Sequence, residues 1–228
     1  MSVKSCIPFI IIVCVFVCAL GGGAAFFHHK KQRLIRAKNA AIEAAAKLSA
    51  AAKQGATPPH VRGDEGATVT LEEFGDFQCP PCGDLSGALQ KLDQDYRIGL
   101  RTVFRQFPMG MHLHAMEAAR AAEAAGLQGR FWEMHDLLYQ NRFVWPQSSD
   151  VRVALIGLAK SLGLDLDRFQ NDMLSPAVKE RIAADQLRGR SLGVDRTPTL
   201  FINGKELPAN ALNPPGLHAA VDEALKVR

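Results

Sequence analysis

The stretch "EEFGDFQCPPCGDLSGAL", residues 72–89, holds two cysteines that are separated only by two prolines. Residues 67–77, which lead into it, alternate apolar and polar side chains, and this alternation predicts a β-strand. The residues from about Pro81 to Tyr96 that follow favour a helix. Cys79 is therefore predicted to lie where a strand ends and a helix begins.

Three kinds of site were compared for Cys79 and Cys82. A zinc site needs four ligands, and one such pair supplies only two of them. His112 and His114, in "MHLHA", offer no standard spacing to the cysteines, and they are interpreted as helix-start or rim residues. A purely structural disulfide across so short a loop would restrict the unfolded chain very little. A redox-active pair is therefore the preferred interpretation, with no metal.

The predicted position assigns different chemistry to the two sulfur atoms. The amide end of a helix favours a negative group, and so it favours the thiolate that attacks disulfides. Cys79 is the predicted nucleophile, and Cys82, one turn further, is the predicted resolving thiol. The spacer prolines stiffen the turn but remove two N–H donors, and the spacer carries no cation. Cys79 is therefore expected to be a weaker oxidant than a cysteine followed by a histidine-containing spacer.

The remaining elements give an α/β order. Residues 98–108 read as a second strand, and about 112–190 read as a long helical region. Residues 197–208 read as two short strands that are joined at Asn203-Gly204, a strong hairpin signal. Residues 215–228 read as a closing helix. The predicted order is strand, helix, strand, helical block, two strands and helix.

Three segments together resemble the DsbA-like thioredoxin-fold disulfide oxidoreductases of bacteria. They are "VRGDEGATVTLEEFGDFQCPPCGDLSGAL" (61–89), "VFRQFPMGMHLHAMEAARAAEAAGLQGRFWEMHDLLYQN" (103–141) and "GVDRTPTLFING" (193–204). The resemblance covers about residues 60–228. It implies a thioredoxin fold with an inserted helical subdomain at about 112–190. It also implies action on protein cysteines outside the cytoplasm, with no cofactor and with a redox partner that resets the pair.

The resemblance extends to three further residues. It implies that Pro198, in "RTPT", forms a cis peptide bond facing the cysteines, and that the backbone of Thr197 pairs with an extended substrate. It implies that Glu73 is a buried acid that takes the proton of Cys82; the alternative is a strand-end acid that reaches solvent. Threonine before this proline resembles the isomerase branch, and the spacer departs from the CPHC pattern. The direction of the redox reaction therefore stays open.

The N-terminus, residues 1–27, is predicted to be a signal-anchor or a signal peptide. Residues 6–27 carry no charge and are long enough to span a bilayer. Ala19-Leu20-Gly21 is an acceptable cleavage site, so a cleaved, soluble periplasmic protein is the alternative. The basic flank "HHKKQRLIRAK" argues instead for a cytoplasmic domain under the positive-inside rule.

Residues 28–59 are predicted to form a basic, Ala-rich linker. Within it, residues 32–54 have a helical composition, either as a lone spacer or as an oligomerisation helix. Residues 1–59 hold eight Lys/Arg and one acid, whereas residues 60–228 hold nineteen and twenty-two. The basic character thus belongs to the extension, which suggests contact with anionic lipid and gives no sign of nucleic-acid binding by the main domain.

The sequence therefore predicts a thiol–disulfide oxidoreductase anchored in the bacterial inner membrane, with its catalytic domain at residues 60–228 in the periplasm or outside the cell. The same fold working as an isomerase or a reductase is one alternative. A tethered peptide-binding module or chaperone without catalysis is another. The Phe131, Trp132 and Met134 cluster is interpreted as core or groove wall, with part of it available to line a peptide-binding surface.

Overall fold

The computed structural model describes the backbone of residues 7–226 and the side chains of residues 28–226. Helix α1 runs from Ile7 to Gln54. The chain divides into two units, Met1–Ser49 and Ala50–Arg228. In the first unit the side chains of 28–49 are exposed, including four large apolar ones, which are Leu34, Ile35, Ile42 and Leu48. Oligomerisation through this helix stays a prediction.

The predicted anchor or signal peptide at residues 1–27 lies outside the residues whose side chains are described. Within the described part of the chain, no helix combines the length and the apolar character needed to cross a membrane.

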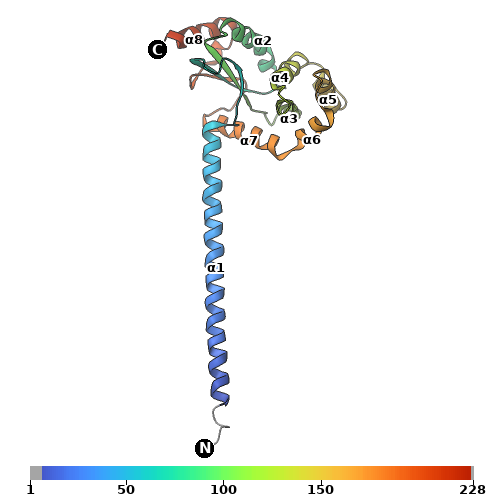
Figure 1. Cartoon of the computed structure of the whole chain (residues 1–228). Coiled ribbons are helices and arrows are strands. Elements are labelled where there is room, and N and C mark those ends of the chain that lie inside the picture. Colours follow the sequence, from blue (N-terminus) through green and yellow to red (C-terminus); the bar gives the residue numbers. More distant parts are fainter. Residues whose placement is uncertain (1–6, 227–228) are drawn as a thin grey trace, which may run out of the picture. The chain divides into compact units, whose positions relative to one another are not determined.

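The second unit is built on a five-stranded sheet with the order β1-β3-β2-β4-β5 (Figure 1). The central strands β2 (Val69–Gly75) and β3 (Leu100–Gln106) are parallel and are joined by helix α2 (Pro80–Asp95). Strands β4 (Thr199–Ile202) and β1 (His60–Gly63) add antiparallel on either side. This arrangement puts the end of β2, and hence the cysteine pair, near the middle of the sheet.

A tight hairpin ends the sheet. Strand β5 (Lys205–Glu206) pairs antiparallel with β4. Asn203 and Gly204 have φ values of 48° and 80°. Both values lie in the left-handed region that asparagine and glycine tolerate best. The hairpin predicted from these two residues is therefore present.

Helices cover both faces of the sheet. On one face, α2 and α8 (Pro214–Lys226) pack leucines and valines against β2, β3 and β4, with Leu71, Leu92 and Leu217 fully buried. On the other face, helix α7 (Pro176–Ser191) packs against β3. Figure 1 shows the sheet between these helices. Since neither face is open to water, charged residues near the centre of β2 are buried whichever way they point.

The helical block between β3 and β4 forms a second apolar cluster. Its helices are α3 (Ala115–Gly126), α4 (Phe131–Gln140), α5 (Val151–Ser161) and α6 (Leu166–Leu174), and they are followed by α7. Alanines of α3 allow α4 and α6 to approach closely, and Phe131 and Met134 are buried among them. Trp132 is partly buried and donates from Nε1 to the carbonyl of Val61 at 2.8 Å. The three residues therefore belong to the core rather than to a groove.

Four buried or partly buried charged residues form a cluster between β2, β3 and α7. We call it the Arg105 cluster, and its members are Glu72, Arg105, Asp185 and Arg188. Arg105 donates from Nε to Glu72 Oε1 at 2.7 Å and from a terminal nitrogen to Asp185 Oδ1 at 3.0 Å. Arg188 holds both oxygens of Glu72, at 2.7 and 2.6 Å. Burial raises the pKa of Glu72, but the two arginines outweigh it, so the net shift is downward.

The Arg105 cluster also binds the residues that precede β1. Ala56 donates its N–H to Asp185 Oδ1 at 2.7 Å, and its carbonyl accepts from Arg105 at 2.9 Å. Near the end of α1, the carbonyl of Lys53 accepts from Arg188, and the carbonyl of Ala52 accepts from Ser191 Oγ at 2.6 Å. These bonds satisfy carbonyls that a helix end leaves without a partner.

The element order agrees with the sequence-based prediction, and the differences are small. Strand β3 begins two residues later than expected, at Leu100, and α2 begins one residue earlier, at Pro80. Strand β1 was not predicted. It is four residues long, and its His60 and Arg62 are half-buried, so it carries no apolar alternation that sequence reasoning could detect.

Candidate active site

Cys79 is the N-cap of α2, at the point where the chain leaves β2. Its backbone is extended (φ −75°, ψ 119°), and Pro80 and Pro81 occupy the first helical positions. Proline is well tolerated there because the first turn of a helix has no partners for its N–H groups. The carbonyl of Cys79 accepts from Gly83 N at 3.2 Å. The nucleophile is therefore held where β2 ends and the first turn of α2 begins.

The segment before β4 lies against Cys79. The Thr197–Pro198 peptide bond is cis, as the resemblance implied for this position. The Sγ of Cys79 lies 3.2 Å from the carbonyl oxygen of Thr197, to which the thiol donates. Pro198 is buried and Thr197 is half-buried. Two segments that are 118 residues apart in the chain thus meet at one sulfur atom.

The pKa values of the two thiols are shifted in opposite directions. A hydrogen bond from the Cys82 thiol is the largest cause that lowers the pKa of Cys79 to about 6, against the opposing effect of burial. The Thr197 side chain and the Cys82 amide also favour the thiolate. Burial raises the pKa of Cys82 well above its usual value, and its bond to Cys79 adds to this. At neutral pH one thiolate is therefore available at Cys79, while Cys82 keeps its proton.

Glu73 lies on β2, on the sheet face that α2 covers. Its side chain is only 2% exposed, and among the described residues no group hydrogen-bonds to its Oε1. Burial raises the pKa of Glu73 to about 8, and the nearby charges of Asp93 and Cys79 push in the same direction. Charge on Glu73 in turn raises the pKa of Cys82. A buried acid that exchanges its proton near neutral pH therefore lies close to the resolving thiol.

A loop after β3 forms one side of the site, and Asp76 holds it. Asp76 Oδ2 accepts from Met109 N at 2.8 Å and lies 2.8 Å from Nδ1 of His112. Asp76 Oδ1 also accepts from Gln78 N at 2.7 Å. Met111 and Leu113, on the same loop, are each 79% exposed. Two large apolar side chains thus face solvent in the loop that Asp76 ties to the turn before Cys79.

Sequence reasoning missed the roles of Asp76 and Gln78. Gln78 Oε1 accepts from His114 N at 2.7 Å, which fixes the start of α3 beside the cysteine turn. His112 and His114 do lie at this helix start, as they were interpreted. An aspartate followed closely by a cysteine turn is a local signal for side-chain bonding to the backbone. Its partners in the loop, however, lie 33 to 36 residues away.

Gly83 lies on the other side of the site, where its lack of a side chain leaves room for Arg142. A Cβ there would lie 2.3 Å from Cδ of Arg142. Arg142 instead crosses the helix start, pairs with Asp84 at 2.8 Å and lies over the ring of Phe143. Phe143 is 73% exposed. Exposed apolar residues are therefore present on both sides of α2's first turn.

Comparison with known proteins agrees with this geometry. The sequence model of the family described as Thioredoxin matches residues 55–223. The chain belongs to the Thioredoxin family. Among solved structures, this family member is similar to a thioredoxin-like oxidoreductase from Silicibacter pomeroyi, with 29% identity, a TM-score of 0.64, and coverage of 75% of this chain and 94% of that one.

A second solved structure extends the agreement in fold. The thiol-disulfide exchange protein alpha-DsbA2 from Wolbachia pipientis has a TM-score of 0.64 at 22% identity, covering 73% of this chain and 87% of that one. The predicted resemblance to DsbA-like thioredoxin-fold proteins, and the thioredoxin fold with a helical part, are thus confirmed.

A curated relative places a similar sequence within a longer protein. "Na(+)/H(+) antiporter NhaA 1" from Salinispora arenicola is 42% identical over 167 residues, which are 72% of this chain and 24% of the relative. This Thioredoxin family member therefore spans about a quarter of the length of that protein.

Proposed function

We propose that this chain is a thiol–disulfide oxidoreductase that acts on protein cysteines through Cys79 and Cys82. The observation that carries the proposal is the contact between Cys79 Sγ and the carbonyl of Thr197. It sets the nucleophile beside backbone groups that can pair with an extended substrate. The Silicibacter pomeroyi relative, described as a thioredoxin-like oxidoreductase, supports the same reaction class.

In the oxidising direction, a substrate thiolate attacks Cys79 Sγ of the Cys79–Cys82 disulfide. A mixed disulfide forms, and Cys82 leaves as a thiolate that takes the proton of Glu73. A second substrate thiolate then attacks the substrate sulfur, so that the substrate disulfide forms and Cys79 leaves as a thiolate. The enzyme gains two electrons, and a redox partner must remove them. Run backwards, the same steps reduce a substrate, with Glu73 taking the proton of Cys82.

Replacing Cys79 with serine is expected to reduce thiol–disulfide exchange to the uncatalysed rate, because serine cannot form the disulfide with Cys82 that a substrate thiolate attacks. The measurement is oxidation of a dithiol peptide by the pre-oxidised protein, with Ser86→Ala on the same helix as a control that keeps full activity.

A second candidate function, peptide binding without catalysis, is favoured by the exposed Met111, Leu113 and Phe143. Peptide binding that is undiminished in Cys79→Ser, together with no oxidation of the dithiol peptide by the native protein, would favour that function and overturn the first.

The spacer prolines set the proposed strength of the oxidant. Pro80 and Pro81 have no N–H, so the first amide available to the Cys79 thiolate is that of Cys82. Pro81→His restores a donor and adds a cation, and the pKa of Cys79 is expected to fall by about one unit. One unit is about 1.4 kcal/mol, which makes the pair about 30 mV more oxidising.

Titration of the pair against glutathione measures this shift in reduction potential. Pro81→Ala is the matched control, because it restores the N–H without the charge and should move the potential by less. A potential that is unchanged in Pro81→His would contradict this account of the spacer. The potential of the native protein also decides between oxidase, isomerase and reductase directions.

The proposed location is the bacterial inner membrane, with residues 6–27 as a single-pass anchor and the catalytic domain in the periplasm or outside the cell. Disulfides persist in such compartments, which is why this location is preferred to the cytoplasmic one that the basic flank favours. Cleavage to a soluble periplasmic protein is the alternative. A reporter that works only outside the cytoplasm, fused after residue 60, should be active; an inactive reporter there, with an active cytoplasmic one, would overturn this location.

A further inference from the structure

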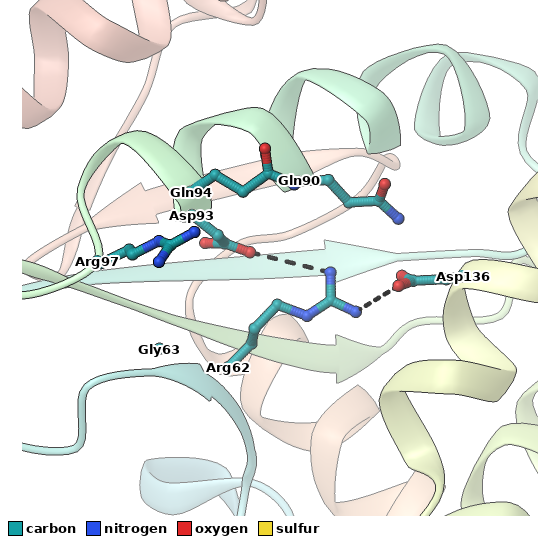
Figure 2. Close-up of a pocket in the computed structure, with 7 residues that line it drawn as sticks. All are labelled: Arg62, Gly63, Gln90, Asp93, Gln94, Arg97 and Asp136. Atoms are coloured by element: carbon teal, nitrogen blue, oxygen red, sulfur yellow. Dashed lines mark hydrogen bonds and ion pairs between the residues drawn. The ribbon is translucent and has the colours of Figure 1, made fainter.

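A polar pocket lies between β1, the C-terminal half of α2 and α4. Its volume is about 430 Å³, and its lining includes Arg62, Asp93 and Asp136. Figure 2 shows the Arg62 guanidinium between the two carboxylates. The pocket opens on the face of the sheet that also carries Glu73, because Arg62 pairs with Thr102, two residues before Phe104, and Phe104 pairs with Glu73. Residues two apart on a strand share a face.

The two carboxylates of the pocket are held differently. Arg62 donates to Asp136 Oδ2 at 2.7 Å but lies 4.0 Å from Asp93 Oδ2. The cation is therefore committed to Asp136. Asp93 is left with a neutral partner, because its Oδ1 accepts from the Thr102 hydroxyl at 2.5 Å. Of the two acids, Asp93 is the one that can exchange a proton near neutral pH.

Thr102 brings Asp93 close to Glu73. On β3 it is the diagonal neighbour of Glu73 on the same sheet face. Glu73 itself has almost no exposed surface, so a proton that it loses or gains must pass through a neighbouring group. Asp93 lines the open pocket and is near enough to Glu73 for its charge to raise the Glu73 pKa. Thr197 precedes β4, which lies on the other side of β2 from β3.

We propose that Asp93 carries protons between the buried Glu73 and the solvent of this pocket, and thereby resets Glu73 after each turnover. The inference rests on the proposed function, in which Glu73 exchanges a proton with Cys82. In the oxidising direction Glu73 gives its proton to the leaving Cys82 and regains one from Asp93, which takes one from solvent. In the reducing direction the proton travels the other way, and no electron moves in either transfer. Asp93 does not touch the sulfur atoms; it acts through Glu73.

The electrostatics of the two acids are consistent with this role. Burial raises the pKa of Asp93 to about 6, against the bond from Thr102 and the charge of Arg62. At Asp136 burial raises the pKa, but His135 and Arg62 lower it by more, so the net shift is downward and Asp136 stays ionised. The charged groups that face Asp93 are Arg62 of β1, Glu73 of β2, Asp136 of α4 and Arg97, which follows α2.

The test uses Asp93→Asn in the full chain. Asparagine keeps the size and can still accept from Thr102, but it cannot carry a proton. Rapid mixing at pH 7 measures the step in which Cys82 resolves a mixed disulfide at Cys79. We expect the rate of this step to fall about tenfold. The alkylation rate of Cys79 and its pH midpoint should not change. Formate is small enough to enter the pocket, and it should restore the rate in proportion to its concentration.

Two control variants make the outcome specific. Gln94 lines the same pocket but is not an acid, so Gln94→Ala should keep the native rate. Asp93→Glu keeps the acid and should keep most of the rate. An Asp93→Asn rate equal to the native one between pH 6 and 8, or a slow rate that formate does not restore, overturns the inference. Glu73→Gln separates this from failure of the proposed function. If Glu73→Gln also leaves resolution unchanged, the role of Glu73 itself fails; if only Glu73→Gln is slow, Asp93 alone is excluded.

Discussion

The Glu73→Gln variant is expected to be more stable than the native protein at pH 8, by about 2–4 kcal/mol in the free energy of unfolding. In the folded protein burial holds the pKa of Glu73 at about 8, whereas an unfolded glutamate ionises near 4.3. Below about pH 4 both states are protonated, and Glu73 costs nothing. As the pH rises from there to 8, the unfolded state loses a proton that the folded state keeps, so the native protein is progressively destabilised.

Urea unfolding of the reduced protein at several pH values measures this difference. The gain from Glu73→Gln should be small at pH 4, grow steadily to pH 8 and then level off, because above about pH 8 the folded native protein loses the Glu73 proton as well. Glu206→Gln is the control, since Glu206 is exposed and, among the residues that the structure describes, pairs only with Arg196 at the surface; its effect should stay within about 1 kcal/mol. A Glu73→Gln gain that is independent of pH would show that Glu73 is not a buried titrating acid.

The Arg105→Met variant is expected to lose about 3–5 kcal/mol of stability, because it leaves buried carboxylates without their cation. The side chains of Arg105 and Glu72 are 8% and 9% exposed, and that of Asp185 is 1% exposed. Burial raises the pKa of Asp185 even with Arg105 present. Without Arg105 the loss should be largest near neutral pH and smaller in acid, where the carboxylates take up protons.

Equilibrium unfolding in urea again provides the measurement. Arg101→Met is the matched control on the same strand and the same sheet face, because within the described part of the chain Arg101 bonds only to Thr70 and the carbonyl of Glu65, near the surface. Its loss should be below about 1 kcal/mol. An equally small loss for Arg105→Met would contradict this prediction, because it would show that the buried carboxylates do not need the Arg105 cation.

The features that sequence reasoning predicted are those that short-range patterns encode. The position of Cys79 at a strand-to-helix junction, the hairpin at Asn203-Gly204 and the strand that carries Glu73 each depend on residues within one element or turn. The resemblance implied that Glu73 is a buried acid, and its side chain is buried. Alternation within a strand is local information, so it survives without knowledge of the tertiary fold.

The features that were missed depend on contacts between distant segments. Glu72 reads as a solvent-facing residue until α7 is known to cover its side of the sheet, where Arg188 lies 116 residues further along the chain. Asp93 reads as an ordinary helix-surface acid until β1 and Thr102 are known to flank it. A charged residue carries no local mark of a buried partner, because the partner's position is set by the packing of whole elements.

The bonds that hold Ala52, Lys53 and Ala56 also determine where the polypeptide can be shortened. A protein truncated to begin at His60 would retain Cys79, Cys82 and every strand that the structure describes, yet Asp185 and the two arginines of the Arg105 cluster would lose partners that residues 52–56 provide. Preparations for crystallisation or kinetics should therefore start upstream of residue 50, so that the final turn of helix α1 is purified together with the domain whose buried charges it contacts.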